Sequence, residues 1–199
     1  MKKFLTFLAI LCTGTAIYTN KFEATVGCHQ YDATGGYNAP HPYFSTKAFR
    51  NIETTTKNVT KLRLGVLARN DGHIRLAPVE YPFNDTKMNE IVLSGWGNTK
   101  IEVRRYTRQS HHTRSESQIL LQQASNGLLS EFRPLMFTVE IQPNGIVSLT
   151  KDDDVDPLLQ FTDTELSFRY IGFSNWDVPA IYFFDCPLEP ERAACDGDF

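Results

Sequence analysis

Residues 90–105 read EIVLSGWGNTKIEVRR, and this stretch decides the fold class. Ile91 and Leu93, which precede the break at residues 95–99, can lie on one face of a strand. The apolar residues that follow the break alternate in the same way. Alternation with a period of two is typical of strands that bury one face. Between them, Gly95, Gly97 and Asn98 accept the backbone angles of a tight turn. The stretch therefore predicts a hairpin, with one buried face and a tryptophan at its tip.

Two tryptophans at turns, Trp96 and Trp176, can be interpreted in two ways. A large ring at the end of a sandwich usually covers the core, and the sequence favours that role for both. An exposed ring could instead stack on the apolar face of a pyranose. For this alternative, the candidate ligand-binding residues are Trp96, Asn98, Arg104 and Trp176.

The composition predicts one domain with a substantial core, because 41% of the 199 residues are hydrophobic. A net charge of −3 leaves no electrostatic footprint for nucleic-acid binding. About ten alternating apolar segments are separated by turn signals, and they do not alternate with helical patterns. This organisation predicts an all-β fold, an antiparallel β-sandwich of the jelly-roll or lectin-like kind.

Several strands can be placed along the chain. We expect strands over residues 43–49, 166–173 and 180–186, and a hairpin in which Asn70-Asp71-Gly72 joins two strands. Residues 28–42 are expected to be irregular. Residues 119–129 could form a strand or a short helix, and the strand is favoured.

The N-terminus has the pattern of a secretory signal peptide over residues 1–16. Lys2 and Lys3 precede an apolar run over residues 4–12, and small residues follow, with cleavage expected after Ala16. Removing two lysines and no acid takes the charge from −3 to −5. No later segment is apolar enough to span a membrane. We therefore expect a secreted, extracellular protein.

Secretion makes disulfides and glycosylation relevant. Cys28, Cys186 and Cys195 remain after cleavage and allow three different single bridges. Cys28–Cys186 is preferred because it would join the first strand to the last, and Cys28–Cys195 is the alternative. The remaining thiol would be free to pair between chains. The triplets at Asn58 and Asn84 are N-glycosylation sequons.

Charged clusters give weaker indications. The carboxylates of residues 152–156 favour a solvated acidic turn over a calcium site, since the EF-hand pattern is not met, and no metal ligand set is predicted. Lys100, Arg104, Arg105, Arg108 and Arg114 form a locally basic sequence. Solvated strand faces are the favoured interpretation, and a surface for an anionic glycan or lipid headgroup is the alternative.

Four motifs in order carry a resemblance to a known family. They are RNDGHIRL at residues 69–76, EIVLSGWGNTK at 90–100 with two arginines at 104–105, the strand at 132–139, and YIGFSNW at 170–176. Together they resemble the farnesoic acid O-methyltransferase-like domain, which is common in arthropod proteins. The resemblance implies a β-sandwich domain over residues 44–186. An N-terminal irregular segment with the first strand at 17–43 and a C-terminal tail at 187–199 would flank it.

The family name implies methyl transfer from S-adenosylmethionine. Most methyltransferases hold that cofactor on a parallel sheet with a strand–GxGxxG–helix unit, and the sequence contains no such unit. We therefore expect a secreted, non-catalytic module with no cofactor, which binds a glycan or an extracellular protein. The alternatives are the methyltransferase itself and a carrier that holds an apolar terpenoid between its sheets. The oligomeric state is not predicted.

Overall fold

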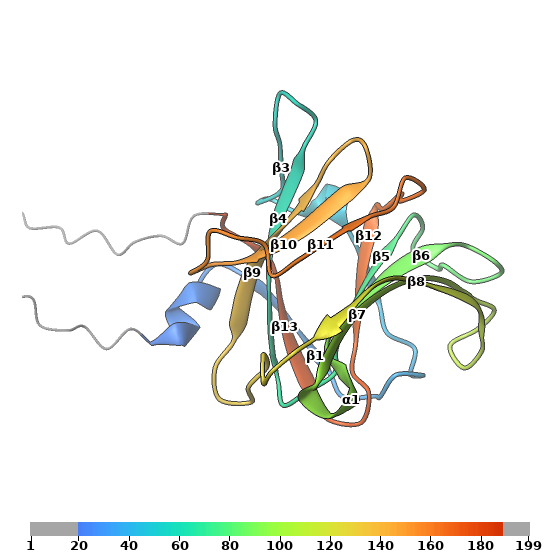
Figure 1. Cartoon of the computed structure of the whole chain (residues 1–199), viewed down its shortest axis with the longest axis horizontal. Coiled ribbons are helices and arrows are strands. Elements are labelled where there is room, and N and C mark those ends of the chain that lie inside the picture. The colour runs from blue at the N-terminus through green and yellow to red at the C-terminus, as the bar shows by residue number, and fades with distance from the viewer. Residues whose placement is uncertain (1–19, 189–199) are drawn as a thin grey trace, which may run out of the picture.

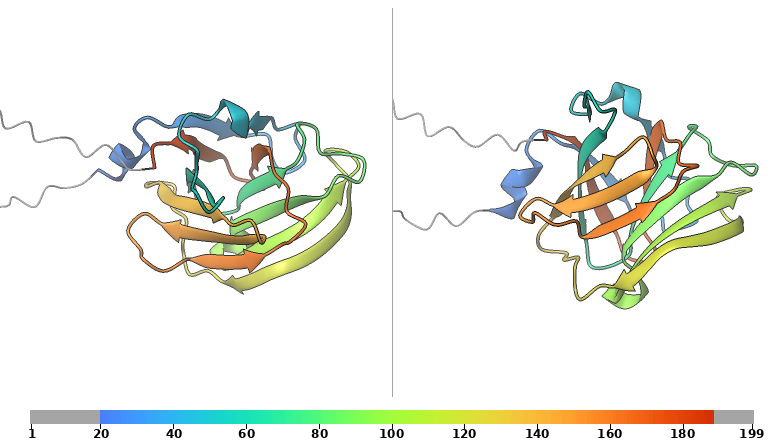
Figure 2. Two further views of the ribbon diagram at one scale, coloured as in Figure 1. Left: turned by 90° about the horizontal axis from the view of Figure 1, so that it is seen from above. Right: turned by 45° about the horizontal axis from the view of Figure 1, so that its top comes forward.

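The computed structural model describes residues 20–188, which form two antiparallel sheets packed face to face (Figures 1 and 2). The all-β sandwich predicted from the sequence is confirmed, with thirteen strands in this range rather than about ten. The predicted signal peptide, Cys195 and most of the predicted tail lie outside the described residues. No helix within them is long and apolar enough to cross a membrane.

The strands are short, as the frequent turn signals indicate. In chain order they are β1 (His29–Ala33), β2 (Tyr43–Ser45), β3 (Glu53–Thr54), β4 (Thr60–Ala68), β5 (Gly72–Ala77), β6 (Met88–Ser94), β7 (Lys100–Arg108), β8 (Arg114–Ala124), β9 (Leu135–Ile141), β10 (Ile146–Lys151), β11 (Leu159–Thr162), β12 (Tyr170–Ser174) and β13 (Ala180–Cys186). The helical segments are η1 (Lys21–Thr25), η2 (Thr46–Ala48) and the single turn α1 (Gly95–Asn98).

One sheet has seven strands in the order β1-β13-β4-β9-β10-β11, with β3 paired to β4. The other has six strands in the order β2-β12-β5-β6-β7-β8. The hairpin predicted from residues 90–105 is confirmed, because β6 and β7 pair antiparallel and α1 joins them at the lower end of the molecule in Figure 1. Residues 119–124 lie in β8, so the preference for a strand there is also confirmed.

The core fills the space between the sheets. Side chains such as Ile74 and Ile91 from one sheet meet Leu64 and Val139 from the other, all fully buried. Aromatic rings pack tightly, with the Phe173 and Tyr182 centroids 4.7 Å apart. Burying such side chains contributes about 1.5–3 kcal/mol each. The carrier hypothesis would place a terpenoid in this same space, which these side chains occupy.

The hairpin predicted around Asn70-Asp71-Gly72 is wrong. β4 belongs to the seven-stranded sheet, where it pairs with β13 and β9, whereas β5 pairs with β6 and β12 in the other sheet. Asp71 does adopt the left-handed conformation of a tight turn, with a φ of 51°. A turn signal predicts where the chain changes direction, but it does not say which strand becomes the partner.

Other element boundaries also differ from the predictions. The strand expected over residues 43–49 ends at Ser45, where η2 begins, and the strand expected over 166–173 begins only at Tyr170. The N-terminal segment expected to be irregular contains β1, and β11 was not predicted. These are short strands with few alternating residues, so the periodic signal in them is weak.

The prediction of one buried face for the β6–β7 hairpin is wrong as well. Glu90 and Arg104 lie on the face opposite the core and are nevertheless buried. The face is covered by residues 34–42, which connect β1 to β2 and which we call the strap. Tyr37 from the strap contacts both of these side chains, as described below.

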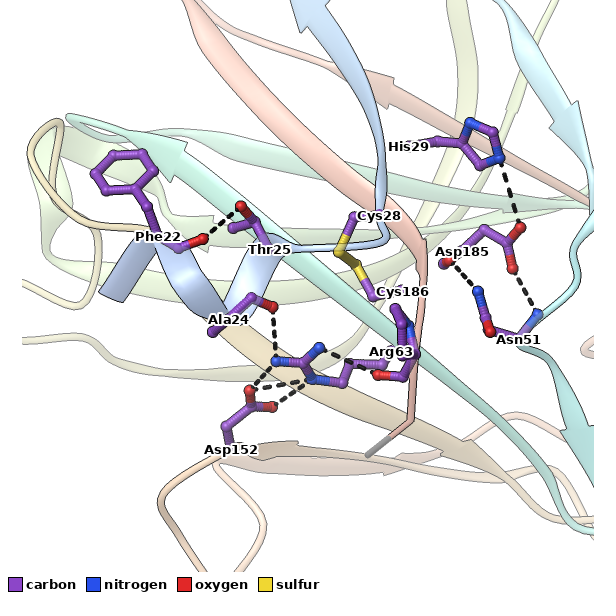
Figure 3. The surroundings of a disulfide bond; sticks show 11 residues. Phe22, Ala24, Thr25, Cys28, His29, Asn51, Arg63, Asp152, Asp185 and Cys186 are labelled. Carbon is purple, nitrogen blue, oxygen red and sulfur yellow. Dashed lines mark hydrogen bonds and ion pairs between the residues drawn. A yellow bond between two sulfur atoms is a disulfide. The ribbon is translucent and has the colours of Figure 1, made fainter. Parts of the chain in front are cut away.

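A disulfide joins Cys28 to Cys186, as the sequence favoured, and it links the start of β1 to the end of β13 (Figure 3). These two strands are also paired in the sheet. Beside the disulfide, the buried Arg63 binds Asp152 through its guanidinium and donates hydrogen bonds to the carbonyl oxygens of Ala24 and Pro187, at 3.0 and 3.1 Å. One side chain thus fastens both ends of the described chain to the seven-stranded sheet.

Candidate binding site

The outer face of the six-stranded sheet carries an alternating set of charged residues. The register places Arg75 of β5 opposite Glu90 of β6, and Glu90 opposite Arg104 of β7. Next to this row, His73 lies opposite Val92. Side chains that are opposite on neighbouring strands stand about 4.5–5.5 Å apart, so these charges interact directly.

Glu90 is fully buried at the centre of this row. Its Oε1 accepts hydrogen bonds from Nε of Arg75 at 2.8 Å and from the hydroxyl of Tyr106 at 3.2 Å. Its Oε2 accepts from Nε of Arg104 at 2.8 Å and from the hydroxyl of Tyr37 at 3.2 Å. Burial alone would raise the pKa of Glu90, but the nearby positive charges, that of Arg75 foremost, outweigh it and hold the pKa well below its usual range.

The strap lays the ring of Tyr37 over this network. The guanidinium carbons of Arg75 and Arg108 lie 4.8 and 4.9 Å from the ring centroid, within cation–π distance. Backbone contacts fasten the strap, since the Tyr37 amide donates to the Trp176 carbonyl at 3.3 Å and the Gly36 amide donates to Oδ1 of Asn175 at 3.0 Å. The strap is therefore part of the sheet's outer surface.

Beside the strap, the surface is hollowed into an open cavity of about 490 Å³. Trp96 and Trp176 both line it, and their side chains remain 49% and 54% exposed. Neither ring belongs to the core clusters, so the favoured interpretation of both as covers on the core is wrong. The other lining residues are Tyr37, Asn70, Asp71, His73, Val92, Gly97, Arg104 and Asp177.

Trp96 is presented by a left-handed turn. The φ angles are 56° at Ser94, 53° at Trp96 and 69° at both Gly97 and Asn98. A left-handed conformation is uncommon for a bulky residue and costs of order 1–3 kcal/mol. Contacts nearby hold the turn, including a hydrogen bond of 2.8 Å from Oγ1 of Thr99 to the Trp96 carbonyl. Backbone strain of this kind clusters at ligand-binding sites, where the surrounding structure maintains it.

The cavity contains polar groups without internal partners. His73 is 3% exposed, and within residues 20–188 neither of its ring nitrogens makes a hydrogen bond, although Nδ1 lies 3.5 Å from Oε1 of Glu90. Oδ1 of Asn70 is buried and also lacks a partner among the described residues. Burial raises the pKa of Asp71, and the carboxylate of Asp177 raises it further, against the opposing effect of His73. Buried polar groups without a partner are few in native proteins, so each of these two calls for an explanation.

Of the four candidate ligand-binding residues, the structure brings three together. Trp96, Arg104 and Trp176 all line the cavity. Asn98 does not line it, and its side-chain amide instead donates to the Leu129 carbonyl at 3.5 Å, on the other side of the turn.

Asp71, His73 and Asp177 also line the cavity and were not predicted from the sequence. For His73 a signal was present, because it alternates with Ile74 of the core face and so shares the outer face with Arg75. For the two aspartates no local signal exists, since they lie in turns that meet only in the folded chain.

The basic sequence from Lys100 to Arg114 does not form one solvated face. Arg104 and Arg108 are buried, the first against Glu90 and the second against the carbonyl oxygens of residues 110 and 111. Arg105 pairs with Asp163 at 2.8 Å. The favoured interpretation of this sequence as solvated strand faces is therefore wrong for Arg104 and Arg108.

The remaining candidate residues can also be placed. Asp152, Asp153 and Asp154 each pair with a cation, namely Arg63, Lys21 and Lys151. Within residues 20–188 no group of three or more His, Cys, Asp or Glu side chains could hold a metal ion. The sequon residues Asn58 and Asn84 are exposed and lie in turns with positive φ.

A family model described as farnesoic acid O-methyl transferase matches residues 37–188, more than half of the chain and the whole of the cavity. No curated protein sequence matches the chain.

Among solved structures, the galectin LEC-6 of Caenorhabditis elegans is 11% identical over 77% of this chain and 94% of its own, with a TM-score of 0.41. A β-1,3-1,4-glucanase (lichenase) derived from a mouse hindgut metagenome is 11% identical over 79% of this chain and 92% of its own, with a TM-score of 0.32. Likeness at these TM-scores has no bearing on what the cavity binds.

Proposed function

We propose that this chain, which belongs to the farnesoic acid O-methyltransferase family as its sequence motifs predicted, is a non-catalytic module that binds a glycan in the cavity of the six-stranded sheet. The observation that carries the proposal is the pair of half-exposed tryptophans, Trp96 and Trp176, on one open cavity. An extracellular location is part of the proposal, and the Cys28–Cys186 disulfide supports it.

The tryptophans supply the apolar part of sugar recognition. A pyranose has one face of C–H groups, which packs on the face of an aromatic ring, and a perimeter of hydroxyl groups that require hydrogen bonds. Aromatic side chains that lie together on one open cavity, unlike single exposed ones, are typical of ligand-binding sites. Two of them on one cavity offer stacking surfaces for one or two sugar rings.

The polar groups of the cavity supply the hydrogen bonds. Asp71, Asp177 and Oδ1 of Asn70 can accept from sugar hydroxyls, and a ring N–H of His73 can donate to one. Arg104 is fixed by Glu90, so its position costs little conformational entropy when a ligand binds. A few placed polar groups among aromatic walls are the usual composition of a small-molecule site.

Binding of an array of oligosaccharides, followed by calorimetry on the sugars that bind, tests the proposal. We expect Trp96→Ala and Trp176→Ala each to weaken binding at least about tenfold, as loss of roughly 1.4 kcal/mol of stacking would do. Phe132→Ala is the matched control, because Phe132 is exposed but does not line the cavity. An array on which no oligosaccharide binds, or equal binding by all four proteins, would refute the proposal.

The methyl transfer implied by the family name is tested separately. Both sheets are antiparallel, and Gly95 and Gly97 lie in the turn of the β6–β7 hairpin rather than between a parallel strand and a helix. We expect calorimetry with S-adenosylmethionine to give no binding heat. Micromolar binding of that cofactor would replace the proposal with an enzymatic one.

A further inference from the structure

The charged side chains in and beneath the cavity can be paired off from their contacts. Beneath it, Arg75 and Arg104 are balanced by Glu90 and Glu102, since each arginine pairs with Glu90 and Nη1 of Arg104 lies 3.3 Å from Oε1 of Glu102. Two positive and two negative charges cancel within this group, and Arg108, whose guanidinium lies on the Tyr37 ring, does not line the cavity. The charges of Arg75 and Arg104 are therefore already balanced by carboxylates of the protein.

Two further carboxylates, Asp71 and Asp177, line the cavity. Within residues 20–188 neither forms an ion pair. Two cations lie close by but outside the lining: the half-buried Lys100, whose ammonium lies 5.4 Å from the centroid of the Trp96 ring, and the exposed Arg69, which precedes Asn70 in the chain. The cavity wall thus has a negative balance.

Donor and acceptor chemistry points the same way. Ionised Asp71 and Asp177, together with the unpartnered Oδ1 of Asn70, only accept hydrogen bonds. A sugar hydroxyl can donate to them, whereas a sulfate or carboxylate group would place one acceptor against another. A second observation marks the same cavity as a ligand site, namely the buried ring of His73 without a hydrogen-bond partner among the described residues.

We infer that the cavity selects neutral saccharides and rejects sulfated or sialylated ones, with Asp71 and Asp177 as the specificity-determining residues. This inference rests on the proposed function. It is opposite to the alternative interpretation of the basic sequence around β7, a surface for an anionic glycan.

The test uses an array that carries each neutral oligosaccharide beside its sulfated and sialylated forms. We expect the neutral form to bind at least about tenfold more tightly, because two carboxylates at contact distances repel a unit anion by about 1 kcal/mol each even in a watery site. The double variant Asp71→Asn/Asp177→Asn should reduce this preference to within about threefold. Asparagine suits position 71, because it tolerates the positive φ found there.

The matched control is Asp153→Asn/Asp154→Asn, which makes the same change in net charge outside the cavity and should leave the preference unchanged. A second measurement needs no saccharide. The chain contains only two tryptophans, so iodide quenching of their fluorescence reports the charge of the cavity. The cavity variant should increase iodide quenching, and the control variant should not.

The outcomes separate the two claims. Saccharide binding without discrimination against the anionic forms, or discrimination that survives in the cavity variant, would overturn this inference and leave the proposed function standing. Absence of any saccharide binding would overturn both. Iodide quenching that is the same in the wild type and the cavity variant would overturn the electrostatic basis of the inference.

Discussion

Glu90 holds a charge where solvent does not reach it, and its hydrogen bonds to two arginines and two tyrosines explain why it can. Replacing it by glutamine would remove the buried counter-charge of Arg75 and would leave Arg104 with Glu102 alone. We expect Glu90→Gln to lower the free energy of unfolding by about 3–5 kcal/mol, measured by urea denaturation at neutral pH. Asp153→Asn, which breaks an exposed pair with Lys21, should change it by less than about 1 kcal/mol. Similar losses in both variants would contradict this account of the network.

The depressed pKa of Glu90 also predicts a pH dependence. Its pKa in the folded protein lies well below that of the unfolded chain, which is about 4.3. The stabilisation is therefore present above about pH 4.3 and is lost as the pH falls through the lower folded-state value. Urea denaturation between pH 7 and pH 3 should show a steeper loss in the wild type than in Glu90→Gln. Parallel curves would mean that the carboxylate is not held by these charges.

For single residues, the sequence predicts which face of a strand a side chain occupies better than it predicts whether that side chain is buried. Alternation correctly assigned Ile91 and Leu93 to the core face, because that pattern is local. It could not predict that Glu90 is buried, since the strap that covers it lies about fifty residues earlier in an irregular segment. The exposure of Trp96 depends on three left-handed residues around it, which glycine and asparagine permit but do not require.

At the scale of elements, the strap is the part whose role a substitution can test. Tyr37→Ala would remove a ring that lies 5.0 Å from the rings of both His73 and Trp176. We expect a loss of about 2–4 kcal/mol in unfolding free energy, together with greater quenching of tryptophan fluorescence by acrylamide. Tyr81→Ala, at an exposed tyrosine, is the control and should change neither. If the two variants have the same unfolding free energy and the same acrylamide quenching, the strap does not stabilise the protein or cover the tryptophans.

Strand pairing was only partly predictable from the sequence, because a turn signal identifies the partner of a strand only when that partner comes next in the chain. The β6–β7 hairpin and the β9–β10 hairpin have their partners next in sequence, so a turn signal sufficed. β4 and β5 are also neighbours in sequence but lie in different sheets, because each has partners far along the chain. The cavity combines α1 with the turn after β12. Which residues line it therefore depends on the topology of the fold, and no local motif predicts them.

For the whole molecule, the disulfide closes the chain on itself. Cys28 and Cys186 are 158 positions apart, so the bond restricts the unfolded chain strongly. Replacing both by serine should lower the free energy of unfolding by about 2–5 kcal/mol. Reduction of the wild type should produce the same loss, and reductant should not affect the serine variant. A reductant effect that persists in the serine variant would show that the stabilisation has another source.

The central claim is that the two tryptophans form the walls of a saccharide site. Its most direct measurement is the titration of a neutral oligosaccharide selected on the array, followed by tryptophan emission and by calorimetry on the same samples. Since Trp96 and Trp176 are the only tryptophans and both line the cavity, we predict a saturable change in emission with the calorimetric dissociation constant. A saccharide that binds by calorimetry and leaves the emission unchanged would contradict the claim.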